Sequence, residues 1–154
     1  MEIARSIVVD KPVSEVFSYV TDIKREPEWA SGIIASKMLT NPPFGVGSHN
    51  AAKVRFLGLH FDTTNTVLEY ELNRLVVSKP ESGSNNAIFY YIFEPFSGVA
   101  GTNGAKFTIK QKVELGGAMK LLKPLIGRWL DTSLQKDLQT LKKLLEAIPY
   151  SVTQ

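Results

Sequence analysis

The sequence contains no cysteine in its 154 residues. A disulfide framework, a thiolate nucleophile and a Cys-ligated metal site are therefore excluded. Histidine is scarce too, with only His49 and His60 present. These two lie on neighbouring predicted strands without a third candidate ligand nearby, and a catalytic zinc ion needs three protein ligands. We therefore expect neither a metal nor a cofactor.

Long apolar runs are also missing. No stretch approaches the ~18 consecutive apolar residues of a membrane-spanning helix. The first residues, MEIARSIVVD, include an acid at Glu2 and too few apolar residues for a signal or transit peptide. We expect a cytoplasmic protein without an integral membrane segment.

Familiar catalytic motifs are absent as well. The sequence has no Gly-x-Ser-x-Gly elbow and no phosphate-binding P-loop. Nothing in it suggests a nucleophile with a base that an acid orients. Whether the protein is an enzyme therefore stays open at this point.

The composition that remains is ordinary for a globular protein, with 44% hydrophobic and 21% charged residues. The length predicts one domain, which we place at residues 1–149, followed by a loose tail at 150–154. The net charge of +3 is mildly basic. It permits contact with anionic lipid or nucleic acid without requiring it.

The start of the chain combines a strand with two short helices. Residues 3–9 are rich in β-branched side chains, which favours a strand. Pro12 suits the first turn of a helix, where its missing N–H is not needed. Apolar residues then share one helical face, namely Val13, Val16, Phe17 and Val20. Pro27 should interrupt this helix near Glu26 and leave Trp29 on a second short piece.

The middle of the chain, residues 33–115, predicts about six antiparallel strands separated by turn-rich segments, including 81–86 and 96–104. The clearest strand covers residues 105–115, where polar and apolar residues alternate strictly. One face carries Lys106, Thr108, Lys110 and Lys112, and the other carries Phe107, Ile109, Gln111 and Val113. Such alternation indicates one solvated and one covered face.

After Gly116 and Gly117 the apolar period becomes helical, which predicts one long amphipathic helix over 118–148. Pro124 and Gly127 predict a kink or a late start. The outer face is basic, with Lys120, Lys123, Arg128, Lys136, Lys142 and Lys143. We interpret this face as solvated, with weak contact with anionic membranes or acidic partners as the alternative. Nucleic acid is not expected, because the aromatic residues lie on covered strands rather than among the basic ones.

A sheet of about seven strands must cover its apolar face, and the long helix is the only element large enough to do so. A twisted sheet touches one helix along a line, so a cavity open at one end should remain between them. The alternative is a core that its own side chains fill completely. The residues that we expect to line the cavity and bind a ligand are Trp29, Val54, Phe56, Thr63, Phe89, Tyr91, Phe93, Phe107, Ile109, Gln111, Met119, Leu122, Ile126 and Trp129.

Several segments resemble the START-like (SRPBCC, helix-grip) superfamily, most of all its polyketide cyclase/dehydrase and lipid-transport branch. They are IVVDKPVSEVFSYVTD at 7–22, EPEW at 26–29, TVLEYELNRLVVS at 66–78, YIFEPFSGVAGTNGAKFTIKQKVEL at 91–115 and LQKDLQTLKKLLEA at 134–147. The resemblance covers almost the whole chain. It implies an α+β helix-grip fold: a curved antiparallel sheet around one long C-terminal helix, with two short helices after the first strand.

The resemblance implies a small hydrophobic ligand, such as a lipid or a polyketide, bound between sheet and helix. A cofactor-free cyclase or dehydratase is the first alternative, with Gln111 and Thr63 or Thr64 as candidate polar groups. A protein-interaction module is the second, because Ile88, Tyr90 and Ile92 make the other sheet face apolar too. Trp29 either packs at the element junction or contacts the ligand. We expect a monomer or a homodimer.

Overall fold

The structure is a computed structural model that describes residues 1–81, 86–97 and 103–149. Parts of the predicted turn at 81–86 and of the predicted loop at 96–104, and the predicted loose tail at 150–154, lie outside the described residues. None of the helices in the described ranges combines the length and the apolar character needed to cross a bilayer.

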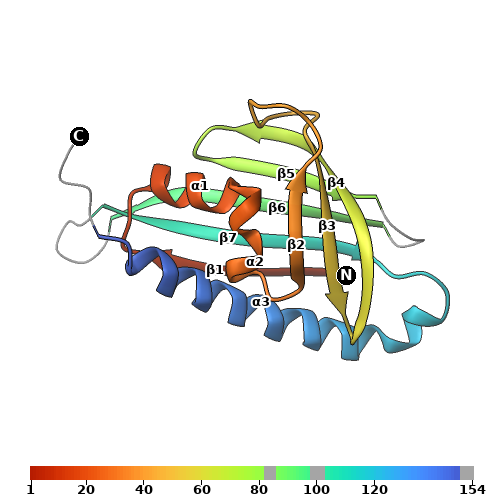
Figure 1. Cartoon of the computed structure of the whole chain (residues 1–154). Helices are drawn as coiled ribbons and strands as arrows, with labels where there is room; N and C mark the ends of the chain where they lie inside the picture. The colour runs from red at the N-terminus through yellow and green to blue at the C-terminus, as the bar shows by residue number, and fades with distance from the viewer. Residues whose placement is uncertain (82–85, 98–102, 150–154) are drawn as a thin grey trace.

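A single antiparallel sheet of seven strands forms the body of the molecule, in the order β1-β7-β6-β5-β4-β3-β2 (Figure 1). The first strand along the chain therefore pairs with the last, and β1 and β2 are the two edges. The strands are β1 (Glu2–Val9), β2 (Ile33–Met38), β3 (His49–Phe56), β4 (Leu59–Glu71), β5 (Leu75–Pro80), β6 (Asn86–Ser97) and β7 (Asn103–Glu114).

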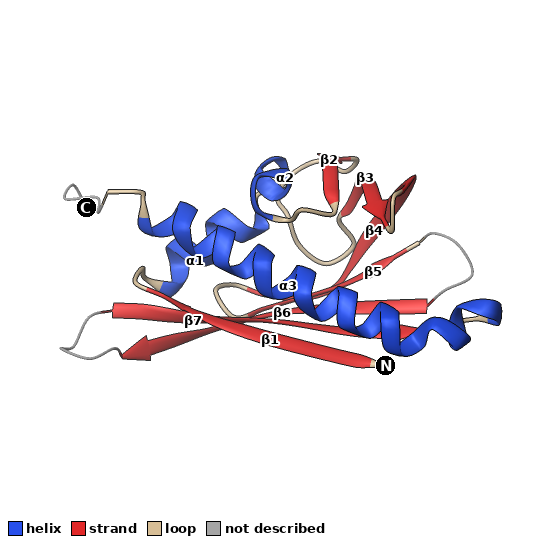
Figure 2. Ribbon diagram, turned by 90° about the horizontal axis from the view of Figure 1, so that it is seen from below, coloured by secondary structure: helices blue, strands red, loops and turns tan. Residues whose placement is uncertain are grey.

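All helices lie on one side of this sheet, inside its curve (Figures 1 and 2). Helix α1 (Val13–Thr21), the 3-10 helix η1 (Ile23–Arg25) and α2 (Glu26–Trp29) connect β1 to β2. A second 3-10 helix, η2 (Gly117–Leu122), precedes the long helix α3 (Lys123–Glu146). The predicted architecture of a curved sheet, two short α-helices after the first strand and one long C-terminal helix is confirmed.

Two local details differ from the expectation for the first helices. Pro12 is the residue just before α1 rather than part of its first turn. The helix ends at Thr21, well before Pro27, because Asp22 adopts an extended conformation and accepts a hydrogen bond from the Lys24 N–H at 3.2 Å. Pro27 instead lies in the first turn of α2, where it costs no hydrogen bond.

The long helix also begins later than the pattern suggests. The segment from Gly117 to Leu122 is a 3-10 helix, and the α-helix starts at Lys123 with Pro124 in its first turn. This is the late start that the proline predicts, because a proline is tolerated in the first turn of a helix and not in its interior. Helix α3 then packs along β1, where Arg5 and Asp131 form a bidentate ion pair at 2.7 Å.

The packed core fills one end of the space between sheet and helices. Phe93 and Phe107 from neighbouring strands stack with ring centroids 4.8 Å apart, and Phe17 of α1 meets Phe93 edge-on at 4.9 Å. Leu138 and Leu141 of α3 close this core from the other side and are almost fully buried. The core thus holds α1 and the C-terminal half of α3 against the sheet.

The hairpin between β3 and β4 has a two-residue turn made by Leu57 and Gly58. Both have positive φ angles, 50° and 79°. This geometry suits the twist of a hairpin and normally selects Asn, Asp or Gly at both positions. Leu57 is therefore an unfavourable choice for the turn itself.

A candidate ligand-binding cavity

A cavity of about 670 Å³ occupies the other end of the space between the sheet and the helices. Its walls come from the end of α1, from η1 and α2, from the strands β2 to β7, and from η2 and α3 as far as Asp137. Its size lies within the ~300–1,000 Å³ typical of pockets for drug-sized ligands. Core residues such as Ile109 and Leu134 form part of its wall but do not fill this space, so the alternative of a completely filled interior is wrong.

Most of the residues that the sequence predicted to line the cavity do so. Trp29 comes from α2, Val54, Phe56 and Thr63 from the β3–β4 hairpin, and Phe89, Tyr91, Ile109 and Gln111 from β6 and β7; Met119, Ile126 and Trp129 come from η2 and α3. The register settles the choice between the two threonines, because Thr63 is buried and faces the cavity whereas Thr64 does not line it. Ligand contact by these residues stays a prediction.

Three of the predicted lining residues do not reach the cavity. Phe93 and Phe107 are on the correct face of the sheet but pack against each other and against α1 within the core. Leu122 is 45% exposed. It ends the 3-10 helix, so the helical apolar stripe of α3 does not continue back through it.

The cavity reaches the surface at a mouth between the β3–β4 hairpin and α3. Its exposed lining residues are Ser31, Arg55, Leu57, Gly58, Phe61 and Lys136. Behind the mouth, Phe56 of β3 meets Trp129 of α3 edge-on, with ring centroids 4.9 Å apart. This aromatic pair bridges the hairpin to the helix.

Inside, the two acids of the cavity wall lie at one corner with Trp29 and Tyr91, and we call these four residues the polar corner: Glu26, Trp29, Tyr91 and Asp137. Glu26 is 9% exposed and its carboxyl group has neither a hydrogen bond nor an ion pair with any residue that the structure describes. Burial raises the pKa of Glu26 from 4.5 to about 7. A carboxyl group that is neutral in part at neutral pH can both donate and accept a proton.

The other members of the polar corner reinforce its acidic character. Burial raises the pKa of the Tyr91 phenol, and the negative charges of Glu26 and Asp137 raise it further, so Tyr91 stays a hydrogen-bond donor. Burial also raises the pKa of Asp137, although the Ser31 N–H donates a hydrogen bond to its carboxylate at 3.1 Å. The corner therefore combines two acids and a phenol.

Two buried polar atoms in the cavity wall lack partners within the described residues: Nε1 of Trp29 and Oδ1 of Asn65. Trp29 also packs on Tyr91 and Phe107 with ring centroids 6.2 and 6.4 Å away. Trp29 therefore packs at the junction and also lines the cavity, and its contact with a ligand stays a prediction. An unpaired buried N–H is costly, and a ligand acceptor would satisfy it.

The sequence analysis did not identify Glu26 or Asp137 as cavity residues. Only Asp137 shows a sequence pattern that could have indicated its position. Asp137 follows Ile126, Leu130 and Leu134 on the apolar stripe of α3, and a charged residue on such a stripe is a candidate for a buried role. Glu26 belongs to a helix of four residues, too short to show periodicity. It is buried because α2 lies between β2 and α3.

Neither histidine belongs to the cavity wall. His49 shares a hydrogen bond of 2.9 Å with the Thr66 hydroxyl, and His60 is exposed on β4. Within the described ranges, the structure brings no three His, Asp or Glu side chains together as a metal site would need.

The outer face of the sheet is less exposed than its apolar residues suggested. Ile88, Tyr90 and Ile92 are all partly buried. The Lys110 and Lys112 ammonium groups lie 4.8 and 5.3 Å from the centroid of the Tyr90 ring. The lysine stems therefore cover the aromatic side chain, as amphipathic side chains commonly do.

A curved antiparallel sheet closed around one long helix, with short helices after the first strand and a cavity between sheet and helix, is the helix-grip fold of the START-like superfamily. The chain belongs to the family described as "Polyketide cyclase / dehydrase and lipid transport", which it matches over residues 1–146. No curated protein is recognisably similar to it in sequence. Family and fold suggest either binding of a hydrophobic ligand or a polyketide cyclase or dehydrase role.

Solved structures with this fold are similar over nearly the whole chain. The protein TTHA0849 from Thermus thermophilus has a TM-score of 0.78 at 13% identity, covering 96% of this chain and 98% of that one. A START superfamily protein from Mycobacterium smegmatis has a TM-score of 0.75 at 16% identity, covering 94% and 97%. The di-domain ARO/CYC protein BexL of the BE-7585A biosynthetic pathway has a TM-score of 0.74 at 18% identity, covering 95% of this chain and 46% of BexL.

Proposed function

We propose that the protein binds one small, mainly apolar molecule in the cavity. The observation that carries this proposal is the cavity of about 670 Å³, which is lined mainly by apolar and aromatic side chains with a smaller number of polar groups. That composition is typical of ligand pockets. A protein that only needed a stable fold would fill such a space, because packing voids lower the stability.

The electrostatics of the cavity narrow the ligand class. The cationic lining residues are Arg55 and Lys136, both exposed at the mouth, whereas the polar corner holds Glu26 and Asp137. A carboxylate or phosphate in that corner would face two acids, and the nearest cation, Lys136, lies at the mouth and already interacts with Asp137. We therefore propose that the end of the ligand in the polar corner is neutral or cationic, for example a hydroxyl, carbonyl or amine, and that any anionic end points toward the mouth.

Binding can be tested with the neutral fluorophore N-phenyl-1-naphthylamine, whose emission rises in apolar surroundings. Ser133 lines the cavity from α3, so Ser133→Trp should fill part of it and weaken probe binding by about tenfold or more. The neighbouring Thr132 is exposed and does not line the cavity, so Thr132→Trp is the matched control. Equal binding by the two variants, with both folded by circular dichroism, would rule out the cavity as the binding site.

A second candidate function is acid–base catalysis on the bound molecule, as in a cofactor-free cyclase or dehydratase. The specific observation in its favour is the buried, unpaired Glu26 carboxyl group with its pKa of about 7. Such a group could take a proton from a carbon beside a carbonyl, or give one to a departing hydroxyl that leaves as water. Tyr91 could hold the carbonyl oxygen by a hydrogen bond.

Once native mass spectrometry or a compound panel has identified a ligand, two conservative variants separate binding from catalysis. Glu26→Gln should keep ligand affinity within a few-fold while abolishing turnover. Gln111→Leu tests the polar group on β7 in the same way, and unchanged turnover would remove Gln111 from the candidates. If the wild-type protein binds the ligand without converting it, the catalytic function is excluded for that ligand and only the binding function remains.

The third possibility, an interaction module with incidental ligand binding, gains no support from the partly buried outer sheet face. The cytoplasmic location and the monomeric or dimeric state stay predictions.

A further inference from the structure

Three leucines at the junction of η2 and α3 are exposed to an unusual degree. Leu121, Leu122 and Leu125 are 85%, 45% and 63% exposed. They follow Met119, which does line the cavity, and they precede Ile126, which is fully buried. We call these three residues the leucine prong. Helix propensity does not require leucine here, because Lys, Arg, Gln and Glu form helices almost equally well and are compatible with water.

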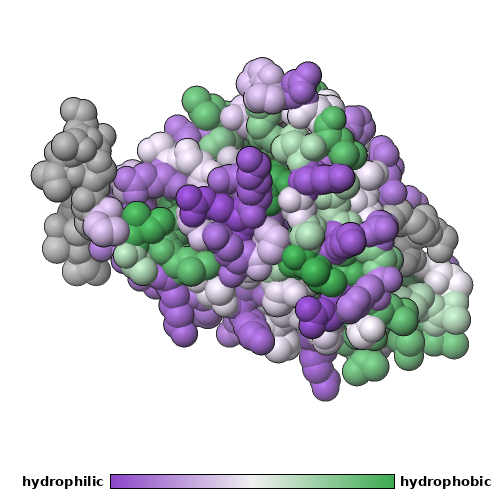
Figure 3. All heavy atoms as spheres, viewed as in Figure 1, coloured by the Kyte–Doolittle hydropathy of each residue, from purple (hydrophilic) through white to green (hydrophobic). Residues whose placement is uncertain are grey.

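A second apolar group lies at the same end of the molecule, on the β3–β4 hairpin. Leu57, Leu59 and Phe61 are 45%, 69% and 42% exposed, and we call them the hairpin tip. Figure 3 shows apolar surface gathered over this end, where Figure 1 places the hairpin and the start of α3. Leu57 occupies its turn with a φ of 50°, which favours Asn or Gly over Leu. The conformation of the turn therefore does not explain why residue 57 is a leucine.

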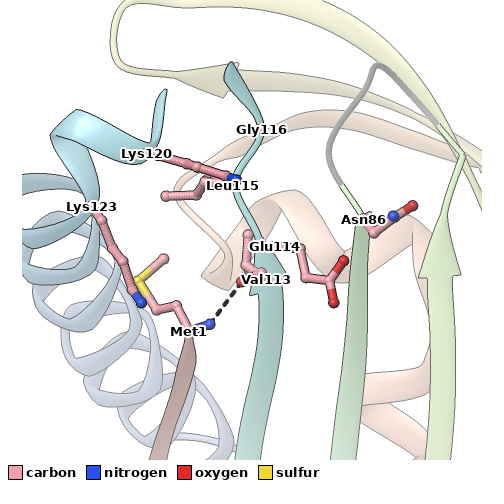
Figure 4. A pocket seen from close by; sticks show the side chains of 8 residues that line it. All are labelled: Met1, Asn86, Val113, Glu114, Leu115, Gly116, Lys120 and Lys123. Atoms are coloured by element: carbon pink, nitrogen blue, oxygen red, sulfur yellow. Dashed lines mark hydrogen bonds between the residues drawn. The ribbon is translucent and has the colours of Figure 1, made fainter. Parts of the chain in front are cut away.

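Positively charged residues also flank the leucine prong in the sequence. From Gly117 to Arg128 the chain carries Lys120, Lys123 and Arg128 and no acidic residue. Lys120 and Lys123 line a hollow of about 550 Å³ beside the amino group of Met1, which donates to the Val113 carbonyl at 3.0 Å. Figure 4 shows that the one acid of this hollow, Glu114, points toward Asn86 and away from Lys123.

We propose that the leucine prong and the hairpin tip insert into the surface of an anionic lipid bilayer, with Lys120, Lys123 and Arg128 against the lipid phosphates. Exposed apolar side chains next to lysines are the composition of surfaces that bind at the membrane interface. Leu57 and Phe61 belong to the mouth, and Met119 lines the cavity next to the prong. The bound membrane would therefore face the opening through which an apolar ligand enters and leaves.

The charge pattern favours an anionic membrane over a second copy of the chain. A two-fold dimer through this end would bring Lys120, Lys123 and Arg128 of both copies together, and like charges at an interface oppose association. The opposite end of β4 provides a comparison. There Leu72 is 69% exposed, but its neighbours in sequence include Glu69 and Glu71. The nearby cation Arg74 is paired with Glu71 at 3.5 Å, so that end has an exposed apolar residue without an excess of positive charge.

The test is co-sedimentation of the whole protein with vesicles of phosphatidylcholine alone or of phosphatidylcholine mixed with phosphatidylglycerol. We expect binding to the anionic vesicles only, weakened by added salt. Leu121→Glu combined with Leu125→Glu should weaken it by about tenfold or more, as should Lys120→Glu combined with Lys123→Glu. Leu72→Glu and Lys143→Glu are the matched controls, exposed residues on the opposite end of β4 and the far end of α3, and should bind as wild type does.

Leu57→Asn separates a membrane role from a structural one. Asn suits the turn better than Leu, so this variant should be at least as stable as wild type while binding anionic vesicles several-fold more weakly. The proposal is overturned if wild-type protein fails to bind anionic vesicles or if the prong variants bind as wild type does. It is also overturned if light scattering shows a dimer that Leu121→Glu with Leu125→Glu dissociates. None of these outcomes depends on whether the cavity holds a ligand.

Discussion

Glu26 and Tyr91 belong to the same buried corner of the cavity, and the charge of the Glu26 carboxylate adds to burial in raising the pKa of the Tyr91 phenol. The phenol therefore keeps its proton throughout the neutral range, whereas Glu26 changes its charge there. One member of the pair is a constant hydrogen-bond donor, and the other switches between donor and acceptor with pH.

Stability should fall as the pH rises through the titration range of Glu26. Between pH 4.5 and about 7, the folded state binds this proton more tightly than the unfolded state does. Raising the pH across this range therefore favours unfolding, by about 3 kcal/mol in total. Glu26→Gln removes this contribution, so the variant should be more stable than wild type above pH 7 and nearly equal to it below pH 4.5. Urea unfolding across this pH range measures the difference.

The difference between wild type and Glu26→Gln isolates Glu26 from Asp137, whose raised pKa acts in the same direction. The control is Glu69→Gln on β4, which replaces an exposed acid. This variant should leave the free energy of unfolding close to that of wild type at every pH. Parallel profiles for wild type and Glu26→Gln would show that Glu26 is not desolvated in the folded protein.

The edge-to-face contact of Phe56 with Trp129 should contribute a measurable coupling energy. A double-mutant cycle with Phe56→Leu and Trp129→Leu should give about 0.5–1.5 kcal/mol, the range found for aromatic pairs beyond their buried area. Urea unfolding of the four proteins provides the values. Phe56→Leu combined with Tyr70→Leu, whose rings have different partners, should instead be additive within about 0.5 kcal/mol. A zero coupling for the first pair would mean that the hairpin and α3 are not joined there.

Truncating Phe107 should affect stability far more than truncating a residue of the cavity wall. Phe107 has no exposed surface and packs on Phe93, so Phe107→Ala should cost about 3–5 kcal/mol. Met119 is partly exposed and lines the cavity, so Met119→Ala should leave the unfolding midpoint close to that of wild type while weakening probe binding. Similar losses of stability in both variants would contradict the division between core and cavity.

A buried lysine connects the segment before α1 to the segment after α3. Lys11, just before α1, is 1% exposed, and its Nζ donates to the Ile148 carbonyl just after α3. Lys11→Met keeps most of the buried stem but leaves that carbonyl without this donor, so it should cost about 1–3 kcal/mol in urea unfolding. The exposed Lys24 is the control, because Lys24→Met should change stability by less than about 0.5 kcal/mol. A loss as small as that of the control would argue against this contact.

Alternation along β7 was sufficient to predict which of its residues face the helices. Phe107 and Ile109 are buried as expected, and Gln111 follows them on the same face. The pattern could not separate core from cavity, because both lie on that one face. Phe107 belongs to the core and does not line the cavity, whereas Ile109 belongs to the core and also lines the cavity.

Irregular backbone limited the prediction elsewhere. The pairing of β4 with β5 shifts between Val67 and Glu69, a bulge that changes which residues face inward. Thr63, Asn65 and Val67 line the cavity, but beyond the bulge Tyr70 contacts the core residue Phe17. Period-two counting fails at such a position, and no residue type in the sequence marks it.

The pairing of the first strand with the last has a consequence for synthesis of the protein. Strand β1 pairs only with β7, from Glu2 with Lys112 to Val9 with Ala105. At about 5–20 residues per second, a ribosome needs roughly 5–20 s to add the chain between these two strands. During that time Ile7 and Val9, which end up buried, have no sheet to join. The nascent chain therefore leaves β1 unpaired until β7 has been synthesised, and the sheet can close only then.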